Sequence, residues 1–178
     1  MGARSRQPRV VKVHLMCGVN TKVVTAVDIS GWTANDTNYF VPLVERTVQH
    51  FEVREVSADK AYLSRKNLNA VGSVGGMPFI PFKSNTLEPT EAGMWARMYH
   101  LFMYRREQYM ELYHKRSNIE TAYSMIKGKF GSALRSKSDT GQINEALCKV
   151  LAHNICVLIQ AMHAFNLHPV FCAEYSSV

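Results

Sequence analysis

Apolar and polar residues alternate in two neighbouring segments near the start of the chain. Residues 10–17 and 22–29 both follow the period of two that is typical of a half-buried β-strand, and residues 18–20 form a turn between them. The pattern therefore predicts a β-hairpin. Lys12 and His14 lie on the more polar side of its first strand, where they face solvent or DNA, and solvent is the favoured alternative.

Helical and extended spacings then alternate along the rest of the chain. The order of the elements predicts an α/β fold with a mixed sheet. Ser64 precedes the second predicted helix and is a good amino-terminal cap for it. The predicted elements are a helix at 40–51, a strand at 52–58, a short helix at 65–71, a strand at 77–82 and helical segments from about residue 94 onward.

The last helical segment begins near Asp139 or Thr140, either of which can cap it. Apolar residues recur at helical intervals over residues 143–162, and this periodicity predicts a core helix without a catalytic role. Polar side chains such as Lys149 and His153 interrupt the apolar run, which argues against a membrane span.

The composition narrows the class of protein. The chain has 178 residues, 47% of them hydrophobic, which is enough for one packed domain. A formal net charge of +7 and an isoelectric point near 9.3 favour a polyanionic partner such as nucleic acid. The cysteines lack the Cys-x2-Cys spacing of a zinc site, and residues 1–10 lack the apolar segment of a signal peptide. These features predict a cytosolic, reducing environment.

Residues 113–127 contain no proline or glycine and predict one helix. At about 100° per residue, Tyr113, Arg116, Glu120 and Lys127 fall within roughly 60° of one another. An arginine one turn before a glutamate and a lysine two turns after it keep that carboxylate ionised, so that it can bind a hard cation. The alternative is a solvated helix face with ion pairs between successive turns. The spacing alone favours the cation site and the solvated face about equally.

The spacing Tyr-x2-Arg-x3-Glu-x6-Lys, with its flanking residues 114–120 and 124–130, resembles the signature of a large group of prokaryotic insertion-sequence transposases of the DDE class. The resemblance implies a ribonuclease-H-like fold, in which helices flank a mixed sheet. It also implies DNA transposition, by phosphodiester hydrolysis and strand transfer with two Mg²⁺ or Mn²⁺ ions. The implied substrates are duplex DNA at transposon ends and at a target site.

Asp59 stands at the end of a predicted strand, and residues 56–63 resemble the family segment in which an aspartate occupies that place. The resemblance implies that Asp59 and Glu120 are catalytic metal ligands, whereas the ordinary alternative for Asp59 is a turn residue before a helix. We expect the two carboxylates to lie within reach of one cation. Three accessory groups, for DNA phosphate or for Glu120, are implied as well: Tyr113, Arg116 and Lys127.

The first aspartate of the family lies on a strand upstream of the hairpin, but residues 1–11 contain no acidic residue. Asp28 and Asp36 are possible substitutes, each with low odds because both lie downstream of that position. The resemblance thus predicts a sheet without its first strand and a domain that is inactive by itself. The predicted division is a basic arm at 1–9, a truncated catalytic domain at 10–165 and a tail at 166–178.

Several cations are predicted to contact duplex DNA, with an affinity that falls as salt rises because phosphate contacts release counterions. The competing hypotheses are a non-catalytic basic DNA-binding protein derived from a transposon and an unrelated basic α/β RNA-binding protein. Besides DNA, the expected partners are a second copy of the chain or an amino-terminal transposase fragment. No membrane partner is expected, and the expected location is the cytoplasm, or the nucleoid when DNA is bound. The cations are Lys12, Lys127, Lys129, Arg135 and Lys137, with Arg4, Arg6 and Arg9 in the arm.

Overall fold

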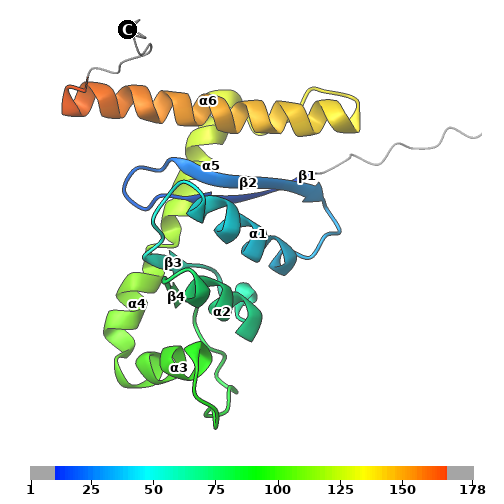
Figure 1. Cartoon of the computed structure of the whole chain (residues 1–178). Helices are drawn as coiled ribbons and strands as arrows, with labels where there is room; N and C mark the ends of the chain where they lie inside the picture. The colour runs from blue at the N-terminus through cyan, green and yellow to red at the C-terminus, as the bar shows by residue number, and fades with distance from the viewer. Residues whose placement is uncertain (1–10, 168–178) are drawn as a thin grey trace, which may run out of the picture.

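The computed structural model describes residues 11–167, which form a mixed α/β fold as the sequence predicts (Figure 1). The predicted arm at 1–9, with Arg4, Arg6 and Arg9, lies outside the described residues, as does most of the predicted tail. The strands are β1 (Val11–Cys17), β2 (Val24–Gly31), β3 (Glu55–Ser57) and β4 (Met77–Phe79). The helices are α1 (Thr37–Val48), the 3-10 turn η1 (Lys60–Tyr62), α2 (Arg65–Ser73), α3 (Met94–Tyr104), α4 (Arg106–His114), α5 (Ser117–Phe130) and α6 (Asp139–Phe165).

The predicted hairpin is confirmed. β1 and β2 pair antiparallel, with Val11 opposite Gly31 and Leu15 opposite Val27, and a bulge interrupts the ladder at the end of β1. The extended pattern of both strands therefore produces the expected pairing, and α1 packs against the hairpin on the side of the large core described below.

His14 is not on a solvent-facing or DNA-facing side of the hairpin, so that prediction is wrong. Its side chain is 6% exposed, lies 2.8 Å from the hydroxyl of Ser30 and stacks on the ring of Tyr39 in α1. Burial lowers the pKa of His14, although the charges of Asp36 and Asp28 partly oppose this effect. A histidine side chain can be buried when its ring nitrogen has a hydrogen-bond partner and its ring stacks on another ring. The alternation of polar and apolar positions does not reveal such contacts.

β3 and β4 pair in parallel, with Glu55 opposite Met77. The connection between them contains η1 and α2, and Ser64 caps α2 as predicted. Both strands are shorter than the segments predicted from the sequence. The strands among the described residues thus form two separate two-stranded sheets, whereas the order of the elements and the resemblance both predicted one mixed sheet.

Most buried apolar side chains belong to one cluster, which we call the large core. It lies between α1, α2, α3, α4 and the β3–β4 sheet (Figure 1). Tyr109 is fully buried in it, and its hydroxyl donates to the carbonyl of Ile80 at 2.8 Å and accepts from the amide of Ile80 at 3.0 Å. The buried members are Phe40, Val44, Val56, Leu68, Val71, Phe79, Ile80, Phe82, Met98, Phe102 and Tyr109.

A second cluster, which we call the small core, lies between the hairpin, α5 and α6. Its buried members are Val24, Ile126 and Val150. Asn154 of α6 ties the helix to β2, because its side-chain amide accepts from the N–H of Val24 and donates to the carbonyl of Val24, both at 2.8 Å. Partly buried side chains complete this cluster: Leu15, Val27 and Phe130.

Residues 113–127 do not form the single helix that the sequence predicts. α4 and α5 are separate helices on either side of a turn at Lys115 and Arg116. In this turn the amide of Arg116 donates to the carbonyl of Tyr113 at 3.0 Å, so the two residues stay side by side. The bend allows α4 to cover the large core while α5 continues to the small core (Figure 1).

α6 differs from the predicted core helix, because one face docks on the hairpin and much of the remainder is exposed. Its cap is Ser138, whose hydroxyl accepts from the amide of Gly141 at 3.1 Å, and not Asp139 or Thr140. In Figure 1 the helix crosses above the hairpin and extends beyond its turn. The buried residues of α6 are Ala146, Val150, His153 and Val157.

Candidate active site

Asp59 lies just beyond the end of β3, where the pairing with β4 fixes the direction of the chain. Its backbone is extended, and its Oδ1 accepts a hydrogen bond from the amide of Ala61 at 3.3 Å, which caps η1. The side chain is 54% exposed. A carboxylate that is anchored through one oxygen and open to solvent keeps lone pairs for a cation.

Glu120 lies in the first turn of α5, where the helix dipole favours a negative charge. Its Oε1 lies 2.8 Å from Nη1 of Arg116, the residue just before the helix. Arg116 is itself held by Tyr113, because its Nε donates to the phenol oxygen at 2.8 Å and its guanidinium lies 5.5 Å from the centre of the ring. Three of the four signature residues therefore form one connected group.

The structure brings Asp59 and Glu120 together around Arg116. The guanidinium nitrogen that binds Glu120 is also 3.7 Å from Oδ2 of Asp59. Burial lowers the pKa of Arg116, but the hydrogen bonds with Tyr113 and Glu120 and the charge of Asp59 outweigh it and raise the pKa above its ordinary value. Two carboxylates from distant parts of the sequence thus share one permanently charged neighbour.

A cavity of about 480 Å³ opens beside this group. Residues 12–17 of β1 form one wall, and residues 55–58, from β3, form another. Successive side chains of a strand point to opposite faces, so a wall that includes consecutive residues is the edge of a strand and not one of its faces. Each of these strands has a single paired neighbour within residues 11–167, and the cavity lies along the other edge of both.

The two free edges offer hydrogen-bonding groups to any extended segment placed between them. Each edge can pair with one further extended segment. One group on the edge of β1 is already used, because the hydroxyl of Tyr123 in α5 donates to the carbonyl of Val13. Burial raises the pKa of Tyr123, which keeps its proton available for this bond.

Further charged side chains line the cavity. Lys12 lies 2.9 Å from Oδ1 of Asp36 and donates to the carbonyl of Ala34 at 3.0 Å, so it is committed to a loop contact. Burial raises the pKa of Tyr62, and the charges of Asp36 and Asp59 raise it further, which shows that both carboxylates act on this part of the cavity. Asp36 therefore faces the same space as Asp59, although Lys12 holds it.

Asp28, the other possible substitute for the first aspartate, lies elsewhere. Its Oδ2 is 3.1 Å from Nη2 of Arg46, and its Oδ1 accepts from the amide of Ile29 at 2.9 Å. The side chain is not part of the cavity wall. Its contacts tie the hairpin to α1 and leave it apart from the pair at Arg116.

Asp59 and Glu120 are the side chains best placed to hold a metal ion. Nowhere in residues 11–167 do three or more His, Cys, Asp or Glu side chains gather closely enough to hold one together. Two carboxylates can provide some of the oxygen ligands of one hard cation, and a site for two ions needs further oxygen ligands. The described residues could therefore supply part of the ligands of such a site, at positions where Arg116 now contacts both carboxylates.

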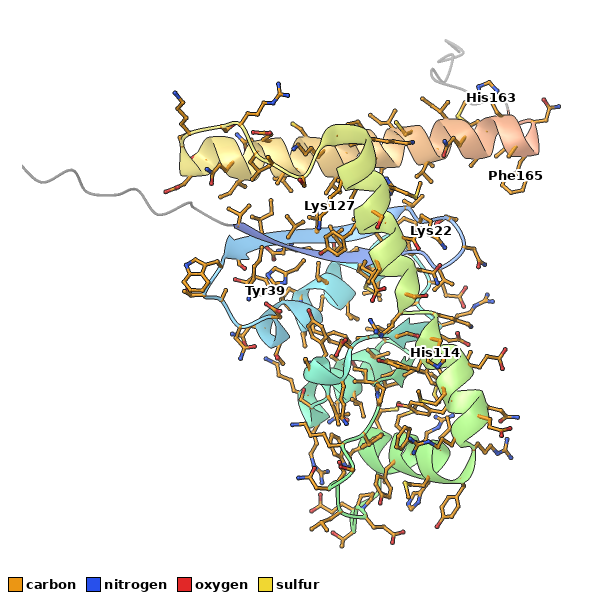
Figure 2. All side chains as sticks on the ribbon, turned by 180° about the vertical axis from the view of Figure 1, so that it is seen from behind. Lys22, Tyr39, His114, Lys127, His163 and Phe165 are labelled. Atoms are coloured by element: carbon orange, nitrogen blue, oxygen red, sulfur yellow. The ribbon has the colours of Figure 1, made fainter. Side chains whose placement is uncertain are left out.

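Lys127 does not join the group around Arg116. It lies two helical turns beyond Glu120, about 10 Å along the helix axis, with its ammonium 5.9 Å from the ring centre of Tyr123. Figure 2 shows Lys127 on the part of α5 beside the hairpin and His114 lower in the view, at the end of α4. It lines a second cavity of about 210 Å³ between β1, α5 and α6.

The remaining predicted DNA-contacting cations gather where α5 leads into α6. Lys129, Arg135 and Lys137 are all exposed there. The connector that carries two of them is ordered by Glu145, which accepts from the backbone amide of Arg135 at 2.9 Å, and by Lys149, which donates to connector carbonyls. Together with Lys127 they are exposed cations between residues 127 and 137.

Sequence reasoning missed two residues of the cavity wall, Tyr62 and Tyr123. A signal for Tyr62 was present, because it follows Asp59 within the segment that resembles the family. Nothing in the sequence marks Tyr123, whose hydroxyl meets a carbonyl far away in the chain. Contacts of this range depend on how α5 packs against β1.

Comparison with protein families matches residues 2–155 to the family described as Transposase DDE domain. No curated protein and no solved structure matches the chain. The matched residues include the hairpin, Asp59, the whole of α5 and the first part of α6. The match concerns the family as a whole, so membership of the Tyr-Arg-Glu-Lys subgroup stays a prediction.

Proposed function

The chain belongs to the transposase DDE domain family, and on this basis we propose that it is a metal-dependent catalytic domain that cuts and joins DNA strands in transposition. Transposition is the function that the family supports, and DNA is the partner on which transposases act. One observation supports the choice of residues: Asp59 and Glu120 both contact the guanidinium of Arg116, which lies beside a cavity.

Asp59 and Glu120 are the proposed metal ligands. The family generally uses divalent metals, and carboxylate oxygens are the preferred ligands of hard cations such as Mg²⁺ and Mn²⁺. A divalent ion bound there supplies activation of the attacking hydroxyl and stabilisation of the leaving oxygen. The β3 end and the first turn of α5 hold the two carboxylates in place for this purpose.

Arg116 prepares the site in this proposal. Its guanidinium contacts both carboxylates and so holds them near one another before a cation binds. Tyr113 holds the guanidinium through its phenol oxygen. If a cation were to take the place of the guanidinium at the carboxylates, Arg116 would be available for a bidentate contact with a DNA phosphate.

The cavity is the proposed place of the third carboxylate. A strand inserted between β1 and β3 would satisfy both free edges and place its own side chains beside Asp59. An aspartate on that strand completes the acidic set that two ions need. Without it, the chain is expected to bind DNA and to cleave it very slowly, since each missing ligand removes several kcal/mol of transition-state stabilisation.

The exposed cations at the α5–α6 end are the proposed DNA surface. Lys127 and Lys129 are exposed in the last turn of α5, and Arg135 and Lys137 are exposed in the connector between α5 and α6. Phosphates bound there would direct a strand along α5 toward Glu120. This arrangement assigns binding to one end of α5 and chemistry to the other.

The proposal is tested by completing the site. A short apolar β-strand that carries one aspartate is fused through a Gly/Ser linker to the amino terminus, and nicking of supercoiled plasmid DNA is measured with Mg²⁺ or Mn²⁺. We expect nicking by the fusion, little or none by the unfused chain, and loss of nicking when Glu120→Ala is introduced into the fusion. The matched control carries asparagine in place of the aspartate and should be as inactive as the unfused chain.

Other outcomes would overturn the proposal. If the asparagine control nicks as well as the aspartate fusion, the third carboxylate is not supplied from the cavity. If the unfused chain is fully active, Asp28→Asn and Asp36→Asn identify which residue acts as the first aspartate. Salt-sensitive DNA binding without nicking in any form, including the fusion, would favour a non-catalytic DNA-binding protein.

A further inference from the structure

The connector between α5 and α6, residues 131–138, contains no helix or strand, yet its backbone is bonded to side chains of α6. A segment without regular structure cannot pair its own N–H and C=O groups, so these groups bond to side chains or to water. Two of the proposed DNA-contacting cations, Arg135 and Lys137, lie in the connector and are exposed. The α6 side chains that bond to it are spaced three and four residues apart, on one face of the helix. They are Gln142, Glu145 and Lys149.

Glu145 binds two successive amides of the connector. Its Oε2 accepts from the N–H groups of Arg135 and Ser136, both at 2.9 Å, and its Oε1 accepts from that of Arg135 at 3.1 Å. Successive N–H groups that converge on one anion form a nest. The hydrogen bond from the amide of Ser136 lowers the pKa of Glu145, although burial partly opposes this effect. The carboxylate is also 3.5 Å from Nζ of Lys149, and its side chain is 22% exposed.

Lys149 and Gln142 bind the carbonyls of the same segment. The ammonium of Lys149 donates to the carbonyl of Gly131 at 3.2 Å and to that of Ala133 at 2.7 Å, and the side chain is 15% exposed. Nε2 of Gln142 donates to the carbonyl of Ser136 at 3.1 Å. Lys149 is therefore committed to the connector, in contrast to the exposed cations that the connector carries.

The end of the connector lies close against the first turn of α6. A Cβ placed on Gly141 would lie 2.8 Å from Oγ of Ser138 and 3.0 Å from Cβ of Ser136. Such distances are shorter than ordinary contacts between side chains, so this approach depends on the missing side chain of Gly141. Shape and hydrogen bonds thus fix the same few residues.

An acidic side chain beside these cations is unfavourable for DNA binding if charge alone is considered. Glu145, however, contacts the backbone amide of Arg135, and the side chain of Arg135 is exposed. A segment that is already ordered loses less conformational entropy when its side chains bind a phosphate. The contacts of Glu145 therefore order the cations without neutralising them.

We propose that Gln142, Glu145 and Lys149 are positioning residues for DNA binding. They hold the connector in the conformation in which Arg135 and Lys137 contact two phosphates of duplex DNA. The inference rests on the proposed function, because it explains how part of the proposed DNA surface is ordered. It adds three residues that act on DNA through the connector and do not touch it.

The test compares two variants of the full chain that have the same net charge, Glu145→Ala and Glu145→Gln. Fluorescence anisotropy with duplex DNA over a salt series gives the affinity and its salt dependence. Removal of a negative charge alone would tighten binding equally in both variants. We expect Glu145→Ala to weaken binding instead, and to lower the slope of log affinity against log salt by up to about 1.8, at about 0.9 for each of two phosphates. Glu145→Gln should bind more tightly than Glu145→Ala, because its amide oxygen still accepts from the connector.

A second comparison separates positioning from a general loss of structure. In the background Arg135→Gln/Lys137→Gln, the further change Glu145→Ala should alter DNA affinity by less than about twofold, because the groups that it positions are already absent. A variant that had unfolded would also lose the contacts of Lys127 and Lys129. Glu111→Ala, at an exposed glutamate of α4, removes the same charge elsewhere and should not weaken binding.

The outcomes distinguish this inference from the proposed function. If Glu145→Ala binds DNA as tightly as the parent chain, or as tightly as Glu145→Gln, the positioning role is wrong and DNA binding by the chain still stands. An equal loss of affinity in the parent chain and in the background without Arg135 and Lys137 would also overturn the positioning role. A parent chain that does not bind duplex DNA at low salt overturns the proposed function, and this inference with it.

Discussion

The two halves of the molecule are packed very differently. The large core has aromatic rings in mutual contact, with Phe82 against Trp95, Tyr99 and Phe102, and a fully buried Tyr109. The small core has few buried apolar side chains, and around it lie a free strand edge, an exposed apolar stripe on α6 and exposed cations. The half with the large core is densely packed and supplies rigidity. The half with the small core has fewer internal contacts and offers surfaces for partners.

The carboxylate pair lies where these halves meet. Asp59 follows a strand of the large core, and Glu120 begins the helix that leads to the small core. One residue of the pair is therefore attached to the large core, and the other to the helix that leads to the small core. This difference predicts that binding of a strand or of DNA at the small core will affect the distance between the two carboxylates.

The largest expected effect is on the stability of the large core. Leu68 is fully buried there, and Leu68→Ala should lower the free energy of unfolding by about 3–5 kcal/mol, because apolar packing is removed and a cavity remains. The control Leu87→Ala, at a largely exposed leucine, should stay within about 0.5 kcal/mol of the parent chain. Urea unfolding measures both, and equal effects would show that the large core is not the stable half.

A smaller effect is expected where α6 is attached to the hairpin. Asn154→Ala removes both bonds to the backbone of Val24, at a cost of about 1–3 kcal/mol. Hydrogen exchange of the Val24 amide should accelerate, while the Ile80 amide, bonded to Tyr109 in the large core, should not change. Asn144→Ala, at an exposed position of the same helix, is the control.

The contrast between the halves would be lost if the Ile80 amide accelerated as much as the Val24 amide. Such a result would mean that the two cores open as one cooperative unit.

DNA affinity should depend on the cations of the small-core half. The variant Lys129→Gln/Lys137→Gln should reduce the slope of log affinity against log salt by about 0.9 for each phosphate that is no longer neutralised. Lys66→Gln, at an exposed lysine of α2 on the large-core half, should leave the slope unchanged. Fluorescence anisotropy over a salt series with duplex DNA measures these slopes, and an equal reduction in the Lys66 variant would place the DNA surface elsewhere.

The smallest effect is a dependence of stability on pH. Burial lowers the pKa of His14 below its ordinary value of 6.5, so the unfolded chain takes up a proton more readily than the folded one. The contribution of neutral, buried His14 to the free energy of unfolding is complete at a pH above 6.5. It is lost as the pH falls below 6.5 toward the pKa of His14 in the folded chain. The free energy of unfolding should decrease in this range, and less so in His14→Gln than in the exposed control His163→Gln.

Local features of the fold could be predicted from the sequence, because they depend on neighbouring residues. The hairpin follows from alternation, and the cap at Ser64 follows from side-chain chemistry at a helix start. The place of Asp59 at a strand end follows from a short segment that resembles the family. Each of these depends on residues that lie close together in the sequence.

Features that depend on contacts between distant segments could not be predicted. The turn at Lys115 and Arg116 has no glycine or proline, and it forms because α4 and α5 cover different cores. The periodicity of α6 correctly indicates an apolar helix, but it does not show that the hairpin covers only one of its faces. Burial of His14 depends on Ser30 and Tyr39, which the alternation along β1 cannot reveal.

That Asp59 and Glu120 form one site is tested most directly by binding of Mn²⁺, measured from the magnetic resonance signal of the free ion. Asp59→Asn and Glu120→Gln should each weaken binding about tenfold or more, as expected for removal of a ligand. The double variant should be little weaker than either single variant, because residues that act on one ion are not additive. Glu111→Gln, at an exposed glutamate of α4, should bind as the parent chain does. Independent, additive losses, or binding that survives both substitutions, would contradict a shared site.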